Sequence, residues 1–150
     1  MPRITTSPAP RHRYYAVPCF RAPEPERPDV EHFFARWCAA LASGDAGAVA
    51  DQYCDTAVLL PTATGTPRVG RAAIRDYFTH FPANRPQGRL VERHAQLGWD
   101  MAVDLGTYVF AFADGREVAA RYTFVWRPVA GRWRITHHHS SAMPERFCEF

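Results

Sequence analysis

The sequence has no long apolar run and no segment that resembles a secretory signal. No stretch approaches the roughly 20 consecutive apolar residues that a membrane-spanning helix needs. The N-terminus carries Arg3, Arg11 and Arg13 without an apolar run behind them, so it does not match a signal peptide. We therefore expect a soluble, cytoplasmic protein that has no membrane partner.

Cysteine is scarce and irregularly spaced. The four cysteines, at positions 19, 38, 54 and 148, form no CxxC pair and no dense framework. This spacing favours reduced thiols over a disulfide scaffold. Cys38 and Cys54 fall in apolar patterns, and we expect them to fill the core.

Motifs for nucleotide cofactors and activated nucleophiles are also missing. The sequence contains no phosphate-binding loop, no dinucleotide fingerprint, no nucleophile motif and no internal repeat. We therefore expect one domain that works without a cofactor.

What is present is a chain of 150 residues, 47% hydrophobic and 13% aromatic, which suits one globular domain with a real core. Residues 1–28 hold seven of the thirteen prolines and should form an extended arm. The expected domain covers residues 29–146, and residues 147–150 form a short tail.

The positive charge of the chain is concentrated in this arm. Five arginines against two glutamates give the arm a surplus of three positive charges, which equals the net charge of the whole chain. The remaining body is therefore charge-balanced, which argues against a nucleic-acid partner for the domain.

Apolar residues at helical spacing predict three helices. The first begins at Asp29 and ends at Ser43-Gly44-Asp45, the second covers 46–54, and the third follows Gly70 and is broken by Pro82. Strands are expected over 56–60, 88–98, 101–113, 117–127 and 132–141. This order predicts an α+β fold, in which helices cover one face of a curved antiparallel sheet and leave a pocket at its open end.

The last two strands should form a hairpin that carries the most unusual residues of the chain. Its second strand ends in His137, His138, His139 and two serines, whose polar groups all need partners. A four-residue loop would place Arg121 opposite His138, and a five-residue loop would place it opposite His139. We expect this positive neighbour to keep the histidine mostly neutral near pH 7.

Several segments together resemble the nuclear transport factor 2-like superfamily. They are Ser-Gly-Asp at 43–45, Asp-Thr-Ala-Val-Leu-Leu-Pro-Thr at 55–62, Tyr-Phe at 77–78, Ala-Arg-Tyr-Thr-Phe-Val at 120–125 and the Trp-Arg-Ile-Thr-His-His-His-Ser-Ser-Ala-Met-Pro run at 133–144. The resemblance covers about residues 29–146. Within the superfamily the chain is most similar to bacterial relatives of the calcium/calmodulin-dependent kinase II association domain, and to small proteins of actinobacterial enediyne polyketide pathways.

The resemblance implies a cone-shaped fold, a cavity between helices and sheet, and a homodimer built on the outer face of the sheet. Two departures bear on the cavity. Leu59-Leu60-Pro61 stands where isomerase-like members carry a carboxylate base, and Tyr108, Phe124 and Ser140 stand where kinase association domains carry arginines. The pocket should therefore be apolar and aromatic.

Three interpretations of the histidines remain open. His137 and His139 share one face of a strand and could bind a metal, but Asp100, Asp104 and Glu145 are not placed as a third ligand, so we expect no metal. Alternatively, the three histidines and Arg121 act on an apolar, polyketide-like molecule by isomerisation, dehydration or cyclisation. The predicted ligand-binding residues are then Tyr53, Tyr77, Tyr108, Tyr122, Phe124 and Ser140.

The third interpretation is structural. The histidines and Arg121 would form a hydrogen-bonded network between two copies of the chain. The protein would then be an association module without catalytic function.

Overall fold

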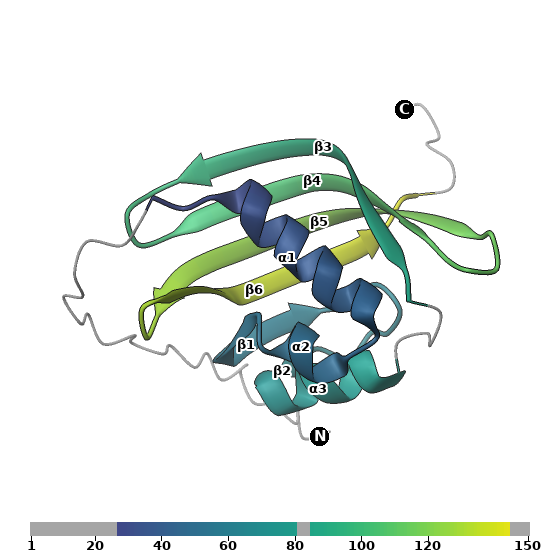
Figure 1. Ribbon diagram of the computed structural model, residues 1–150, viewed down its shortest axis with the longest axis horizontal. Helices are drawn as coiled ribbons and strands as arrows, with labels where there is room; N and C mark the ends of the chain where they lie inside the picture. Colours follow the sequence, from purple (N-terminus) through teal and green to yellow (C-terminus); the bar gives the residue numbers. More distant parts are fainter. Residues whose placement is uncertain (1–26, 81–84, 145–150) are drawn as a thin grey trace, which may run out of the picture.

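The computed structural model describes residues 27–80 and 85–144 (Figure 1). The predicted tail over 147–150, and the predicted arm over 1–28 apart from Arg27 and Pro28, lie outside the described residues. Among the described residues, no helix combines the length and the apolar character that crossing a membrane requires.

The first helix, α1 (Val30–Ser43), begins and ends where the capping residues place it. The Asp29 side chain accepts the backbone N–H of His32 at 3.0 Å, which satisfies one of the free donors of the first turn. Gly44 adopts the left-handed conformation, with φ 74°, and its N–H donates to the Leu41 carbonyl.

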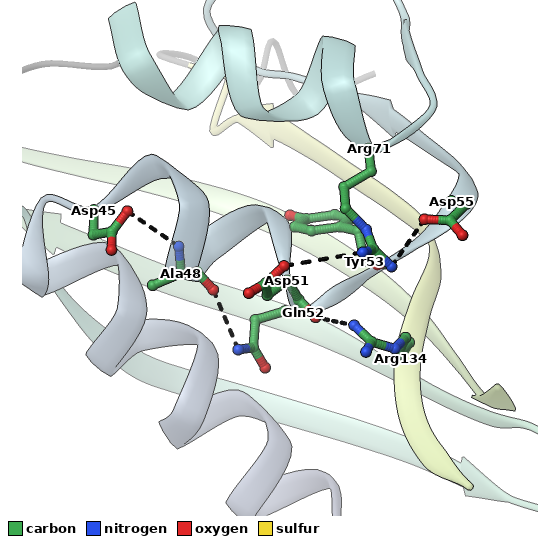
Figure 2. Close-up of polar contacts among 8 residues, drawn as sticks. All are labelled: Asp45, Ala48, Asp51, Gln52, Tyr53, Asp55, Arg71 and Arg134. Atoms are coloured by element: carbon green, nitrogen blue, oxygen red, sulfur yellow. Dashed lines mark hydrogen bonds and ion pairs between the residues drawn. The ribbon is translucent and has the colours of Figure 1, made fainter. Parts of the chain in front are cut away.

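The second helix is shorter than predicted, because the chain changes to a strand at Tyr53. Helix α2 covers Ala46–Ala50 and strand β1 covers Tyr53–Leu60, so the predicted helix over 46–54 is wrong at its C-terminal end. Figure 2 shows why the backbone extends here: the Asp51 carbonyl accepts from Arg134, and the Tyr53 carbonyl accepts from Arg71. These carbonyls therefore bond to other elements instead of continuing the helix.

The remaining elements occur in the predicted order, apart from the short strand β2, which was not predicted. They are β2 (Arg68–Val69), α3 (Arg71–His80), β3 (Gln87–Leu97), β4 (Ala102–Ala111), β5 (Glu117–Val129) and β6 (Arg132–Ala142). The six strands form one sheet in the order β2-β1-β6-β5-β4-β3. Its pairings are antiparallel except for β1 with β6, which is parallel, so the sheet is mixed and departs from the antiparallel prediction at this pair.

Helix α1 runs across the inner face of the sheet, while α2 and α3 lie together beside β1 and β2 (Figure 1). The core fills the space between α1 and the sheet. Phe34 and Trp37 of α1 pack on Phe124 of β5 with ring centroids 6.3 and 5.2 Å apart. The predicted α+β fold with three helices is confirmed.

The register of the β5–β6 hairpin differs from both predicted alternatives. Only Ala130 and Gly131 separate the strands, and both have positive φ angles, 50° and 75°, as a tight two-residue hairpin turn requires. An irregularity between Val125 and Trp126 adds Thr136 as an extra residue of β6. Arg121 consequently lies opposite Ser141 and not opposite His138 or His139.

Candidate functional site

A cavity of about 180 Å³ lies between the helices and the inner face of the sheet. Its apolar wall is formed by Trp37, Leu41, Leu59, Pro61, Ala63, Phe78, Phe110, Phe112, Val118 and Ala120. Its polar lining consists of Thr62, Tyr77, Tyr108, His138 and Ser140. No charged side chain is among these lining residues. The cavity therefore suits a neutral, mostly apolar molecule.

His138 is the imidazole that the fold places in this cavity. The side chain is only 2% exposed. Its ring stacks on Phe124, with centroids 4.1 Å apart, and meets Trp37 edge-on at 5.4 Å. Two aromatic neighbours from different elements thus fix the orientation of the ring.

A chain of hydrogen bonds holds the His138 ring at its Nδ1 atom. The Trp37 indole N–H donates to the Tyr53 hydroxyl at 3.1 Å, and the same hydroxyl lies 2.8 Å from Nδ1 of His138. Burial raises the pKa of Tyr53 well above its usual value, so the phenol keeps its proton.

Burial also determines the charge of His138. Its pKa is lowered to about 3, chiefly by loss of solvation and in smaller part by the neighbouring His137 and His139. The ring is therefore neutral at pH 7, as predicted. The cause, however, is burial, and not a charge on Arg121 opposite the ring.

The second nitrogen of this ring, Nε2, is buried and has no hydrogen-bond partner among the described residues. Most buried polar atoms in folded proteins do have a partner, and leaving a donor or acceptor unpaired costs about 1–3 kcal/mol. A residue that lines the apolar cavity therefore carries a buried polar atom that no described residue satisfies.

A second polar group is a chain of three hydroxyls. Ser140 lies at its centre, with its Oγ 2.5 Å from the Tyr108 hydroxyl and 2.6 Å from Oγ1 of Thr62. Burial raises the pKa of Tyr108, so this phenol stays protonated. Thr62 is exposed. The chain thus connects a buried phenol with the surface beside Pro61.

Asp104 forms a separate buried cluster that sequence reasoning missed. It is fully buried, and its carboxylate accepts from Arg93 Nε at 2.9 Å and from the Tyr122 hydroxyl at 3.0 Å. Burial raises the pKa of Asp104, although both hydrogen bonds favour the carboxylate. Arg93 also donates to the Val30 carbonyl at 3.4 Å, so the cluster connects the start of α1 to the sheet.

The structure separates the predicted site residues into four groups. His138, Tyr77, Tyr108 and Ser140 line the cavity. Tyr53 and Phe124 contact His138 directly, while Tyr122 belongs to the Asp104 cluster. Arg121, His137 and His139 lie on the outer face of the sheet.

Strand pairing shows the position of this outer group. His137 lies opposite Val125, His139 opposite Thr123, and Arg121 opposite Ser141. Arg121 and His139 are exposed, and together they line a shallow hollow outside the sheet. Arg121 therefore does not reach a ligand in the inner cavity. Among residues 27–80 and 85–144, no three histidine, cysteine or acidic side chains come close enough to hold a metal ion.

Trp37 and Thr62, which hydrogen-bond within the site, are not among the predicted site residues. Trp37 lies on the apolar side of α1, and helical spacing cannot distinguish a side chain that fills the core from one that lines a cavity. Thr62 lies outside the strand, in the segment after β1. Its position directly after Pro61, at the end of β1, was the one signal that it borders the pocket.

The model of the calcium/calmodulin dependent protein kinase II association domain family matches residues 26–144. The chain belongs to this family. Among solved structures, a protein from Xanthomonas campestris described as such an association domain is 43% identical. The match covers 78% of this chain and 87% of that chain, with a TM-score of 0.73.

Two solved structures from Novosphingobium aromaticivorans have lower sequence identity to this chain than the Xanthomonas campestris protein. A nuclear transport factor 2-like protein with a cystatin-like fold is 18% identical, covers 78% of this chain and 81% of that chain, and has a TM-score of 0.65. A protein that bears the name of an aromatic ring hydroxylase is 27% identical to this chain. The match covers 77% of this chain and 87% of that chain, with a TM-score of 0.64. No curated protein matches the chain. The predicted resemblance to the nuclear transport factor 2-like superfamily is confirmed.

Proposed function

We propose that this association domain binds a small, neutral, largely apolar organic molecule in the inner cavity. The observation that carries the proposal is the cavity wall, which is apolar and aromatic and contains no charged side chain. Apolar and aromatic walls of this kind gain van der Waals contacts with an apolar molecule of matching shape.

The size of the cavity limits the ligand. An apolar cavity of about 150 Å³ is large enough for benzene, and this cavity measures about 180 Å³. A substituted single ring or a compact bicyclic molecule fits this space. The similarity to a protein named as an aromatic ring hydroxylase supports a ligand with an aromatic ring.

The more specific form of the proposal is conversion of a polyketide-like intermediate by isomerisation, dehydration or cyclisation. In that form His138 would take up a proton during the reaction. Burial lowers the pKa of His138 to about 3 and makes the ring a weak base. Binding alone places no such demand on His138, so we propose binding as the function and conversion as its extension.

Two adjacent alanines of β5 provide the test. Ala120 is 2% exposed and lines the cavity, whereas Ala119 is exposed on the opposite face of the strand. Binding of toluene and naphthalene would be followed by amide chemical shifts of the full chain. Ala120→Leu places three extra carbons in the cavity and should weaken binding at least tenfold, because the ligand and the new side chain compete for the same space.

Ala119→Leu is the matched control and should leave binding unchanged. Two results would contradict the proposal: no binding by the wild-type protein, or an equal effect of the two substitutions.

A second function, association of two copies through the outer face of the sheet, is favoured by the family to which the chain belongs. The outer face of β4, β5 and β6 carries the half-buried residues Val103, Leu105 and Val125 beside His137 and Thr123. We propose this face as the contact between copies.

Val125→Arg should shift the mass in light scattering from dimer to monomer, because a charged side chain would enter an apolar contact. Val69→Arg, on the exposed strand β2, is the control and should keep the dimer. A monomeric wild-type protein would refute this second proposal.

A further inference from the structure

We infer that the ligand of the cavity carries a carbonyl oxygen, and that this oxygen accepts a hydrogen bond from Nε2 of His138. The inference rests on the proposed ligand-binding function and makes it more specific. It names a chemical class, that of neutral aromatic or alicyclic ketones, aldehydes and esters.

The donors and acceptors along the Trp37, Tyr53 and His138 chain fix the positions of its protons. The Trp37 indole nitrogen can only donate, so the Tyr53 oxygen accepts its hydrogen. The phenol hydrogen of Tyr53 then needs an acceptor, and Nδ1 of His138 lies 2.8 Å away. Nδ1 is therefore the acceptor nitrogen, and the proton of the neutral imidazole is on Nε2.

The imidazole that carries this proton is surrounded by aromatic rings. His138 lines the cavity, its ring is held between Phe124 and Trp37, and Nε2 has no partner among the described residues. The site thus presents a fixed hydrogen-bond donor in apolar surroundings. Such a donor selects strongly for a ligand that accepts a hydrogen bond, since otherwise the N–H stays unpaired.

Ser140 lies within hydrogen-bond distance of both Tyr108 and Thr62, so two of the three hydroxyl hydrogens are used inside that chain. Nε2 of His138, by contrast, has no partner among the described residues. An anionic acceptor such as a carboxylate is disfavoured, because none of the described lining residues carries a compensating charge. A neutral carbonyl oxygen satisfies Nε2 without placing a charge in the cavity.

Acetophenone and α-methylstyrene provide a matched pair of probes, since they differ in shape only by the exchange of C=O for C=CH2. Wild-type protein should bind acetophenone about fivefold more tightly or better, corresponding to one net hydrogen bond. Titration with acetophenone should also shift the ¹⁵N and ¹H signals of the Nε2–H group of His138, whereas α-methylstyrene should shift them much less.

In His138→Phe, which keeps an aromatic ring between Phe124 and Trp37, the affinity ratio should fall to about one. Near-ultraviolet circular dichroism would check the fold of this variant. If it does not fold, the imidazole ¹⁵N shifts of the wild-type protein still decide, because they report which ring nitrogen carries the proton.

Equal affinity for the two probes, or a proton on Nδ1, would overturn the carbonyl inference and leave the proposed function in place. Binding of neither probe would overturn both.

Discussion

At the scale of single residues, the position of His138 explains its charge and its chemistry. Its side chain is buried among aromatic rings, and Tyr53 occupies one ring nitrogen. A neutral imidazole in such surroundings donates from the other nitrogen and accepts a proton poorly. The histidine therefore acts as a fixed donor and not as an exchangeable base.

The low pKa of His138 predicts that the protein loses stability in mild acid. Unfolded histidine titrates near pH 6.5, while burial lowers the pKa of His138 to about 3. Between these values the unfolded state binds a proton that the folded state excludes, so stability falls as the pH decreases through this window. At pH 4.5 the loss from this residue should be about 2–3 kcal/mol.

The measurement is urea unfolding of wild type and His138→Gln between pH 7 and pH 4.5. Glutamine has no titrating group, so the variant should lack the loss of unfolding free energy that protonation of His138 causes. Subtracting the two curves of unfolding free energy against pH cancels the contributions of other residues. If the unfolding free energies of the two proteins change in parallel with pH, the pH dependence does not come from His138.

Tyr53→Phe should destabilise the protein by about 1–3 kcal/mol in urea unfolding, because removal of one hydroxyl leaves two buried groups without a partner. These are the Trp37 N–H and Nδ1 of His138. Tyr108→Phe is the matched control. It should cost less, because Ser140 keeps Thr62 as a partner at 2.6 Å. A larger loss for Tyr108→Phe would show that the Tyr53 hydroxyl does not join the two groups.

At the scale of elements, the close approach of the paired strands β3 and β4 depends on a glycine. A Cβ added to Gly106 would lie 1.9 Å from the carbonyl oxygen of Glu92, which is backbone and cannot rotate away. Gly106→Ala should therefore force the two strands apart and cost about 1–3 kcal/mol or more.

Gly65→Ala is the control for this prediction. Gly65 has open space around its Cα and no positive φ angle, so the substitution should change the unfolding free energy by less than about 0.5 kcal/mol. Equal stability of the two variants would show that the strands do not approach as closely as described.

The order and the bounds of most elements could be predicted from the sequence. The caps at Asp29 and Gly44 placed α1, and alternating β-branched and aromatic residues placed the long strands to within a few residues. Local patterns of this kind depend on neighbours in the chain, so they can be read without the fold.

What depends on distant partners could not be predicted. Strand β1 begins at Tyr53 because it pairs with β6, and that pairing is parallel. The hairpin register depends on Ala130, a residue that rarely takes the positive φ observed here, and on the extra residue Thr136. These two features move Arg121 away from the expected histidine.

For the candidate site, the sequence identified the unusual histidines but not which of them faces inward. Alternation along a strand requires His137 and His138 to point to opposite faces. The face that each one occupies is decided by the irregularity at Thr136, which has no signature in the sequence. Arg121 and His139 were therefore assigned to a cavity from which the sheet separates them.

At the scale of the whole molecule, the sheet divides the two proposed functions between its faces. The inner face carries the uncharged cavity, and the outer face carries Arg121, His137 and His139. A substitution on one face should therefore leave the function of the other face intact, provided that the fold is kept.

Ligand binding should stabilise the entire domain by mass action. At a free acetophenone concentration one hundred times its Kd, the unfolding free energy should rise by about 2.7 kcal/mol. This gain should be independent of protein concentration, whereas stabilisation by association grows with it. Urea unfolding at two protein concentrations, with and without acetophenone, separates the two effects.

Ala120→Leu again provides the control, since its filled cavity should show a much smaller gain from acetophenone. A gain that is equal in this variant would indicate that acetophenone acts elsewhere on the molecule.

The extra residue in β6 has a consequence for the identity of the cavity wall. Trp133 and Ile135 pack toward the core before Thr136, and His138 and Ser140 do so after it. If β6 were regular and Thr136 took an ordinary outward position, the odd positions would continue inward, and His137 and His139 would replace His138 and Ser140. A run of three histidines presents an imidazole to the interior in either phase, so a one-residue slip would change the neighbours of the ring but not its chemistry.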